Sequence, residues 1–278
     1  MNKEPLRLLI LGAHPDDAEF HAGGLVAAWR RRGQVVKLVS LTNGAAGHFR
    51  VPAEPLAALR RREAAEAAAV VGAESAVWDE PDGELVASLT VRRRVIREIR
   101  TFRPNLVLTH RPNDYHPDHR AAGQLVQDAS YMVTVPGVLP DVPALREDPV
   151  VAYLPDVFTR PCPLRPDVIS DVTDRVETIV RMLACHRSQV FEWLPYEEGI
   201  LDTVPDDPGE RLRWLTDWYL RHVCPRLERF SGSLAAALGG QWPSRVRAAE
   251  VFELSEYGGR ADRATLEQLF PDAVVLAS

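Results

Sequence analysis

Residues 6–17 read LRLLILGAHPDD, and this stretch decides the fold. A single charge, Arg7, interrupts the apolar part, which is typical of a buried parallel strand. An imidazole and two carboxylates follow at once in one tight turn, as His14, Asp16 and Asp17. Burying these groups beside a strand costs free energy unless something compensates their charge, and a divalent cation would do so. The stretch therefore indicates a strand that ends in a metal site.

A second cluster of the same kind, His116-Pro117-Asp118-His119, follows another apolar stretch at residues 105–110. Each cluster alone also fits the N-terminal cap of a following helix, where acidic side chains are favoured. Two such clusters, each just past the end of a strand, favour the metal site over two independent caps.

Strands and helices alternate through the first half of the chain. The pattern predicts strands over 6–13, 34–42, 75–78 and 105–109, and helices over 20–32, 56–71 and 91–102. This order is typical of an α/β, Rossmann-like fold with a mostly parallel sheet and helices on both faces. In the common strand order 3-2-1-4-5, the first and fourth strands are neighbours where ligands bind. The two clusters follow those two strands, so topology and ligand chemistry indicate the same place.

The second half is less regular. Prolines are frequent over residues 134–168, where we expect loops and a short strand at 150–154. A strand over 167–172, a helix over 173–186 and a Trp- and Arg-bearing helix over 207–230 follow. The sequence shows no internal repeat and no clear linker, so we expect a single domain over 1–278 with an irregular C-terminal half.

Composition excludes several classes of function. The chain has 278 residues, 46% of them hydrophobic, and a net charge of −6, so no basic domain suggests a nucleic-acid partner. No stretch is apolar and long enough for a membrane span. Three widely separated cysteines without a CxxC motif and the lack of a signal peptide predict a cytoplasmic protein with unpaired thiols. The oligomeric state stays open, a homo-oligomer included.

The two clusters together hold the parts of a metal-dependent amide hydrolase. A catalytic zinc needs about three protein ligands and one open position, and His14, Asp17 and His119 would supply the ligands. Asp16 and His116 would then lie beside the metal. A free carboxylate accepts a proton from water, and an imidazolium stabilises an oxyanion or protonates a leaving amine. The remaining histidines are expected to be surface or packing residues: His21, His48, His110 and His222.

Two competing chemistries lack their motifs. No G-x-G-x-x-G follows the first strand, which excludes the usual dinucleotide site. No G-x-S-x-G elbow appears either, which argues against a serine hydrolase.

The sequence resembles the PIG-L (LmbE-like) de-N-acetylase family. Residues 12–19, GAHPDDAE, followed by Gly23-Gly24, resemble its first signature, and residues 116–119 resemble its second. Weaker matches keep the same order: the loop at 42–47, the Arg-bearing helix at 60–72 and the H-x-S-Q element at 186–189. The resemblance covers roughly residues 6–190.

This resemblance implies a Rossmann-like fold and zinc-dependent removal of an N-acetyl group from an amino sugar, usually a glucosamine unit. It implies zinc ligation by His14, Asp17 and His119. It further implies a general base at Asp16 and an acid or oxyanion partner at His116, oriented by Asp118. The substrate contacts would come from Arg60, Asn43 and His186. Some relatives place a tyrosine two residues before the first histidine of the second signature. Here that position is Asp114 and the tyrosine is Tyr115, so we expect no tyrosine assistance.

Two other interpretations of the same residues stay open. Two histidines and a carboxylate also hold Fe²⁺ in non-haem iron oxygenases. A metal- or sugar-binding module without activity is the second, although metal binding alone requires neither Asp16 nor His116.

Three arginines run together at residues 60–62, and a helix turns about 100° per residue, so they cannot share one face. We expect Arg60 to face the metal cleft and Arg61 or Arg62 to face solvent.

Overall fold

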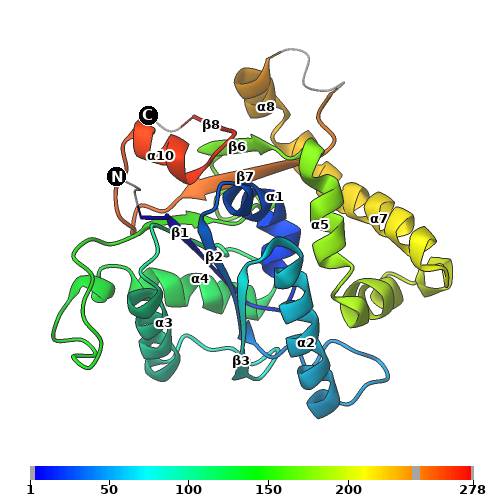
Figure 1. Ribbon diagram of the computed structural model, residues 1–278, viewed down its shortest axis with the longest axis horizontal. Coiled ribbons are helices and arrows are strands. Elements are labelled where there is room, and N and C mark those ends of the chain that lie inside the picture. The colour runs from blue at the N-terminus through cyan, green and yellow to red at the C-terminus, as the bar shows by residue number, and fades with distance from the viewer. Residues whose placement is uncertain (1–3, 240–244, 277–278) are drawn as a thin grey trace.

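The computed structural model describes residues 4–239 and 245–276. Eight strands form one sheet in the order β3-β2-β1-β4-β5-β7-β6-β8 (Figure 1). The strands are β1 Arg7–Gly12, β2 Val35–Thr42, β3 Glu74–Glu80, β4 Leu106–Thr109, β5 Val150–Tyr153, β6 Val168–Asp171, β7 Ala249–Leu254 and β8 Ala273–Val275. Strands β1 to β5 pair in parallel, whereas β7 runs antiparallel to β5 and β6, and β8 antiparallel to β6.

Helices cover both faces of this sheet. They are α1 Asp17–Arg31, α2 Ala53–Val71, α3 Leu89–Phe102, α4 Pro117–Ala129, α5 Val176–Leu183, α6 Leu194–Glu197, α7 Pro208–Arg229, α8 Ser231–Leu238 and α10 Arg263–Leu269. A π-helical turn, Gln189–Trp193, precedes α6. Within the two described ranges, no helix combines the length and the apolar character that crossing a membrane requires.

Strand β1 supplies both layers of the core, because successive side chains of a strand point to opposite faces. Leu8 and Ile10 pack in the cluster that contains Trp29 of α1. Leu9 and Leu11 pack in the cluster that contains Val95 and Ile99 of α3 and Leu125 of α4. All four β1 side chains are fully buried, which explains why the sequence there is apolar without a period.

The predicted fold class is confirmed: the sheet is mostly parallel, and β1 and β4 are neighbours as expected. The helix predicted over 173–186 is shorter, because a 3-10 turn at Thr173–Arg175 precedes α5. Strand β7, inserted antiparallel between β5 and β6, was not predicted as a strand. Cys162, Cys185 and Cys224 are unpaired, as their spacing indicated.

Helix α1 is kinked at Ala22, whose φ of −140° and ψ of 17° are not helical. Just after the break, the amides of Gly24 and Leu25 donate to the buried carboxylate of Glu250 on β7. Gly24 is required there, since a Cβ would lie 2.4 Å from Cγ1 of Val172. The kink thereby fixes α1 against the C-terminal strands.

Candidate active site

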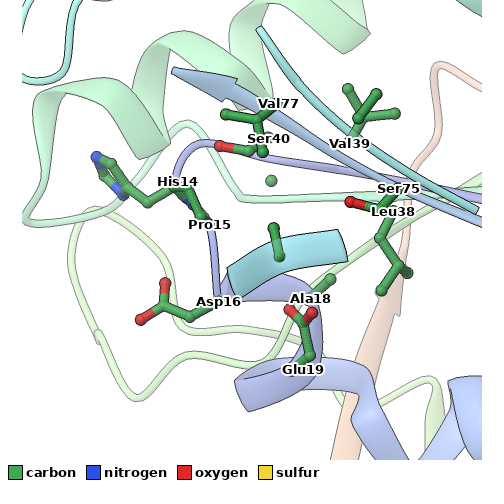
Figure 2. Close-up of a pocket in the computed structure, with 13 residues that line it drawn as sticks. His14, Pro15, Asp16, Ala18, Glu19, Leu38, Val39, Ser40, Ser75 and Val77 are labelled. Atoms are coloured by element: carbon green, nitrogen blue, oxygen red, sulfur yellow. The ribbon is translucent and has the colours of Figure 1, made fainter. Parts of the chain in front are cut away.

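The turn from β1 into α1 is built by its own side chains. The backbone N–H of His14 donates to Oδ2 of Asp17 at 2.7 Å, which closes the turn. Gly12 is needed beneath it, because a Cβ there would lie 2.9 Å from Cβ of Asp17. Asp16 sits at φ 126°, an unfavourable conformation for a side chain other than glycine. Figure 2 shows the side chains of His14 and Asp16 pointing in one direction, away from the strands that carry Ser75 and Leu38.

The second cluster lies at the start of α4. His116 is the N-cap of this helix, and its Nδ1 accepts the backbone N–H of Asp118 at 3.2 Å. His119 follows in the first turn. Because β1 and β4 are adjacent in the sheet, the two clusters meet beyond the carboxyl ends of these strands.

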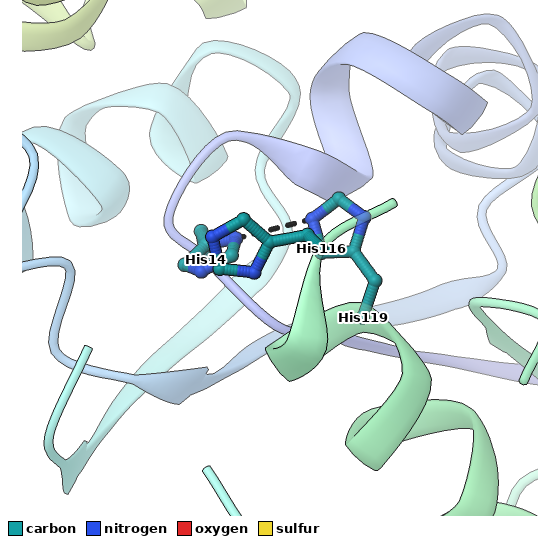
Figure 3. Close-up of side chains that lie close together, drawn as sticks. All are labelled: His14, His116 and His119. Atoms are coloured by element: carbon teal, nitrogen blue, oxygen red, sulfur yellow. Dashed lines mark hydrogen bonds between the residues drawn. The ribbon is translucent and has the colours of Figure 1, made fainter. Parts of the chain in front are cut away.

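Three side chains converge there in a way that fits one metal ion. Nδ1 of His14 lies 3.2 Å from Nε2 of His119 and 3.7 Å from Oδ2 of Asp17. Nε2 of His119 lies 3.5 Å from Oδ1 of Asp17. Two ligands of a tetrahedral zinc, each about 2.1 Å from it, are about 3.4 Å apart. The three observed separations are close to that value, although the two that involve Asp17 use different oxygens of its carboxylate. Figure 3 shows the rings of His14, His116 and His119 gathered at the start of α4.

The ring nitrogens of His14 and His119 that point away from each other explain why a cation would be stable between the two rings. Nε2 of His14 donates to Oδ2 of Asp118 at 3.2 Å, and Nδ1 of His119 donates to Oδ1 of Asp114 at 3.1 Å. Carboxylates only accept, so these nitrogens carry the protons. In neutral rings the two nitrogens that face each other across 3.2 Å then both present lone pairs. Only a shared proton or a metal ion makes that contact favourable, and carboxylates behind metal-binding histidines are common.

Further ionisable side chains surround His14 and Asp17. Oδ1 of Asp82 lies 3.2 Å from Nε2 of His14, and Nε2 of His110 lies 2.9 Å from Oδ2 of Asp17. Burial alone would lower the pKa of His14, but Asp118 and Asp82 outweigh it and raise this pKa to about 10. The excess of negative charge around His14 thus favours a positively charged occupant.

Asp16 differs from Asp17 in its partners. Burial and the nearby charge of Asp17 raise the pKa of the Asp16 carboxyl to about 7, against the opposing charges of His186 and Arg60. The pKa of Asp17 is instead held well below its usual range: burial raises it, but His110 and His119 outweigh that effect. The pKa values of the two adjacent carboxyls are therefore shifted in opposite directions. The Asp17 carboxyl is suited to holding a cation, and the Asp16 carboxyl is suited to exchanging a proton.

These residues lie on the wall of a cavity of about 630 Å³. The wall also includes Arg60, Pro155 to Phe158 of the Pro-rich segment, Trp193, and Trp218, Pro225 and Arg226 of α7. A volume of this size is in the range of small-molecule sites.

The three arginines lie as expected. Arg60 is buried, and its Nη2 donates to the carbonyl of Gly47 and to Oε1 of Gln189. Arg61 and Arg62 are exposed and pair with Asp79 and Glu66.

Three neighbouring residues that were expected in the site have other side-chain partners in the structure. The Asp118 carboxylate does not orient His116; it accepts from His14 and from the amides of Gly83 and Leu85. Asn43 does not line the cavity, because its Oδ1 accepts the N–H of Ala45 in its own loop. His186 does not line it either: it is fully buried, with Nε2 3.2 Å from Oε1 of Glu19.

Sequence reasoning missed several residues of the site. Asp82 and Asp114 each place a carboxylate behind a histidine of the site, and His110 contacts Asp17 although it was expected to be a packing residue. Asp82 follows β3 and His110 follows β4, so the rule that indicated the two clusters also applies to them. Neither stands in a recognisable motif, and for that reason they were overlooked.

Comparison with known proteins finds similarity over much of the chain. Residues 9–130 match the family model described as PIG-L, GlcNAc-PI de-N-acetylase. The diacetylchitobiose deacetylase of Thermococcus kodakarensis is 28% identical over 235 residues, covering 79% of this chain and 86% of that protein. The 4-oxalmesaconate hydratase of Pseudomonas putida is 28% identical over 204 residues, covering 70% and 79%.

A solved structure shares the fold. The N,N'-diacetylchitobiose deacetylase of Pyrococcus horikoshii superimposes with a TM-score of 0.66 at 23% identity, covering 91% of this chain and 84% of that one. The matched family region contains both His/Asp signatures and the strands that position them. The chain is thus similar to the PIG-L (LmbE-like) family over the region that carries both His/Asp signatures.

Proposed function

We propose that the protein is a zinc-dependent hydrolase that removes an N-acetyl group from an amino sugar, in particular from an N-acetylglucosamine conjugate. One observation carries this proposal. Ligand atoms of His14, Asp17 and His119 lie 3.2–3.7 Å apart, with a different oxygen of Asp17 toward each histidine, and Asp16 and His116 line the same cavity. Relatives named as deacetylases of diacetylchitobiose and of a glucosaminyl inositol support the substrate class.

His14, Asp17 and His119 would hold the metal, which when bound supplies Lewis acidity to the amide carbonyl and the attacking water. His116 is close enough to form a second group with His14 and His119. We assign it to catalysis because a fourth protein ligand would close the position that a catalytic site keeps open.

Asp16 and His116 would share the proton transfers. Water adds to the acyl carbon as Asp16 accepts its proton, and the C–N bond then breaks as His116 protonates the amine nitrogen. Acetate and the free amino sugar leave. The raised pKa of Asp16, about 7, matches the requirement that a base exchange protons near neutral pH.

Amine release from a panel of N-acetyl sugars, measured with added zinc, tests the proposal. Asp16→Asn should lose roughly 10²–10⁴-fold in kcat while keeping its zinc, since only the base is removed. His119→Ala should lose the zinc itself. Near-native turnover by Asp16→Asn would show that this residue only shapes the turn.

The hydratase relative and the iron interpretation provide the competing outcomes. Hydration of 4-oxalmesaconate without amine release from any sugar would replace the deacetylase proposal with a hydratase. Activity that requires Fe²⁺ and consumes oxygen would instead identify a non-haem iron enzyme.

A further inference from the structure

Two side chains of the cavity wall, the half-buried His21 and the buried Arg226, play no part in the proposed proton transfers. His21 lies on α1, one turn after Asp17, and Arg226 lies near the end of α7. Nη2 of Arg226 lies 2.8 Å from Nδ1 of His21, and both residues line the 630 Å³ cavity. The contact joins segments that are 205 residues apart in the chain.

The contact fixes the tautomer of His21. A guanidinium has only donors and stays charged, so Nδ1 of His21 must accept. The proton of the neutral ring is therefore on Nε2. Burial and the positive charge of Arg226 also hold the pKa of His21 well below its usual range, which keeps the ring neutral. In the structure of residues 4–239 and 245–276, Nε2 has no hydrogen-bond partner.

Arg226 is held in place without being neutralised. Its guanidinium lies 5.4 Å from the ring centroid of Phe20, and its Nη1 is buried without a hydrogen-bond partner among the described residues. No carboxylate in that part of the chain lies within 4.0 Å of it. The carboxylate of Asp156 on the cavity wall pairs with Arg111 instead, which donates two hydrogen bonds of 2.6 and 2.9 Å to it.

We propose that His21 is a substrate-binding residue that donates a hydrogen bond from Nε2 to an oxygen acceptor of the substrate, and that Arg226 is the positioning residue that fixes this donor. The proposal rests on the proposed deacetylase function for the identity of the substrate. The acceptor is either a carboxylate on the aglycone or a neutral oxygen of the acetylated sugar. A carboxylate and a carbonyl or ether oxygen of the sugar accept hydrogen bonds and have no proton to donate, so they suit a ring that is fixed as a donor.

Histidine ¹⁵N chemical shifts test the tautomer independently of any activity. In the zinc-loaded full-length protein at pH 6–8, Nδ1 of His21 should have the shift of an unprotonated nitrogen and Nε2 that of a protonated one. Arg226→Met should abolish this single-tautomer pattern. Arg229→Met is the matched control, because Arg229 is exposed on the same helix and does not line the cavity. A charged His21 ring, or a proton on Nδ1, would overturn the proposal.

Kinetics with two model substrates identify the acceptor. The carboxymethyl and ethyl glycosides of N-acetylglucosamine differ only in the aglycone carboxylate. His21→Phe removes the donor and keeps an aromatic ring, so KM should rise ~10-fold or more with little change in kcat, the pattern for lost uniform binding. A rise for the carboxymethyl glycoside alone identifies a carboxylate, and an equal rise for both identifies a neutral oxygen.

An unchanged KM for both glycosides, with zinc content and melting temperature intact, would overturn the role of His21. If neither glycoside is deacetylated by the wild type, the deacetylase proposal fails and acetate serves as the probe. Acetate should then shift the Nε2 resonance of the wild type and not that of Arg226→Met, and the absence of any shift would overturn the inference on its own.

Discussion

At the scale of single residues, the site depends on which nitrogen of each ring carries a proton. In His14 and His119, the ring nitrogen that faces a carboxylate carries the proton. In His21, Nδ1 accepts from Arg226, so the proton is on Nε2. The contiguous motifs predicted the converging ligands because the spacing within a turn is short-range information. The partners behind them come from separate loops, and only the tertiary structure brings Asp82 and Asp114 to these rings.

The placement of Arg60 leads to a prediction about substrate affinity. Arg60→Ala should raise KM more than it lowers kcat, because the guanidinium lies on the cavity wall and holds the loop at Gly47. Arg61→Ala is the control, since Arg61 is exposed and pairs with Asp79. Steady-state kinetics of both variants measure this, and equal effects would indicate a diffuse basic face.

The buried carboxyl of Glu250 predicts a pH dependence of stability. Burial raises its pKa from 4.5 to about 7, against the two amides and the arginines that favour its charge. A group with a raised pKa in the folded state stabilises the fold below its unfolded pKa. That contribution is lost between pH 4.5 and 7 and corresponds to about 3 kcal/mol.

The free energy of unfolding of Glu250→Gln, measured by urea denaturation at several pH values, checks this. Relative to the variant, the wild type should lose stability as the pH rises from 4.5 to 7. Glu267→Gln, at an exposed position on α10, should follow the wild type. A constant difference between wild type and Glu250→Gln would contradict the prediction.

At the scale of elements, the sequence predicted most helices and strands to within a few residues, because long apolar patterns and glycine caps mark them. Gly72, for example, ends α2 in the left-handed conformation. Strand β7 and the π-helical turn were not predicted: their form depends on neighbours distant in the chain. At the start of α4, His116 is the cap and accepts the N–H of Asp118. The Asp118 carboxylate accepts from His14, which lies 104 positions away and could not be indicated by the local sequence.

The kinked helix α1 gives a prediction at this scale. Gly24→Ala should destabilise the protein by about 1–3 kcal/mol, because the added Cβ would lie 2.8 Å from Cβ of Val172 and 2.9 Å from Oε1 of Glu250. Gly232→Ala on α8 is the matched control, since its added Cβ meets nothing within 4 Å. Thermal unfolding of both variants measures this loss of stability. Equal melting temperatures would show that the kinked segment accommodates the methyl group without cost.

At the scale of the whole molecule, the proposed metal ligands join segments far apart in sequence: the turn after β1 and the start of α4. Zinc at about 1,000 times its dissociation constant should therefore stabilise the folded state by ~4 kcal/mol. Removing it with a chelator should lower the melting temperature, and restoring it should reverse the change. His119→Ala should show neither response, and an equal response would place the ion elsewhere.

The cavity wall is assembled from both halves of the chain, with consequences for how such a protein diversifies. The groups proposed for bond breaking lie within residues 14–119, whereas Trp193, Trp218 and Arg226 of the wall come from residues 189–229. Part of the wall that contacts the substrate is thus encoded apart from the groups proposed for the reaction, although Arg60 and His21 lie in the first stretch. Exchanging the later stretch between relatives would redirect the same hydrolytic chemistry to a different conjugate.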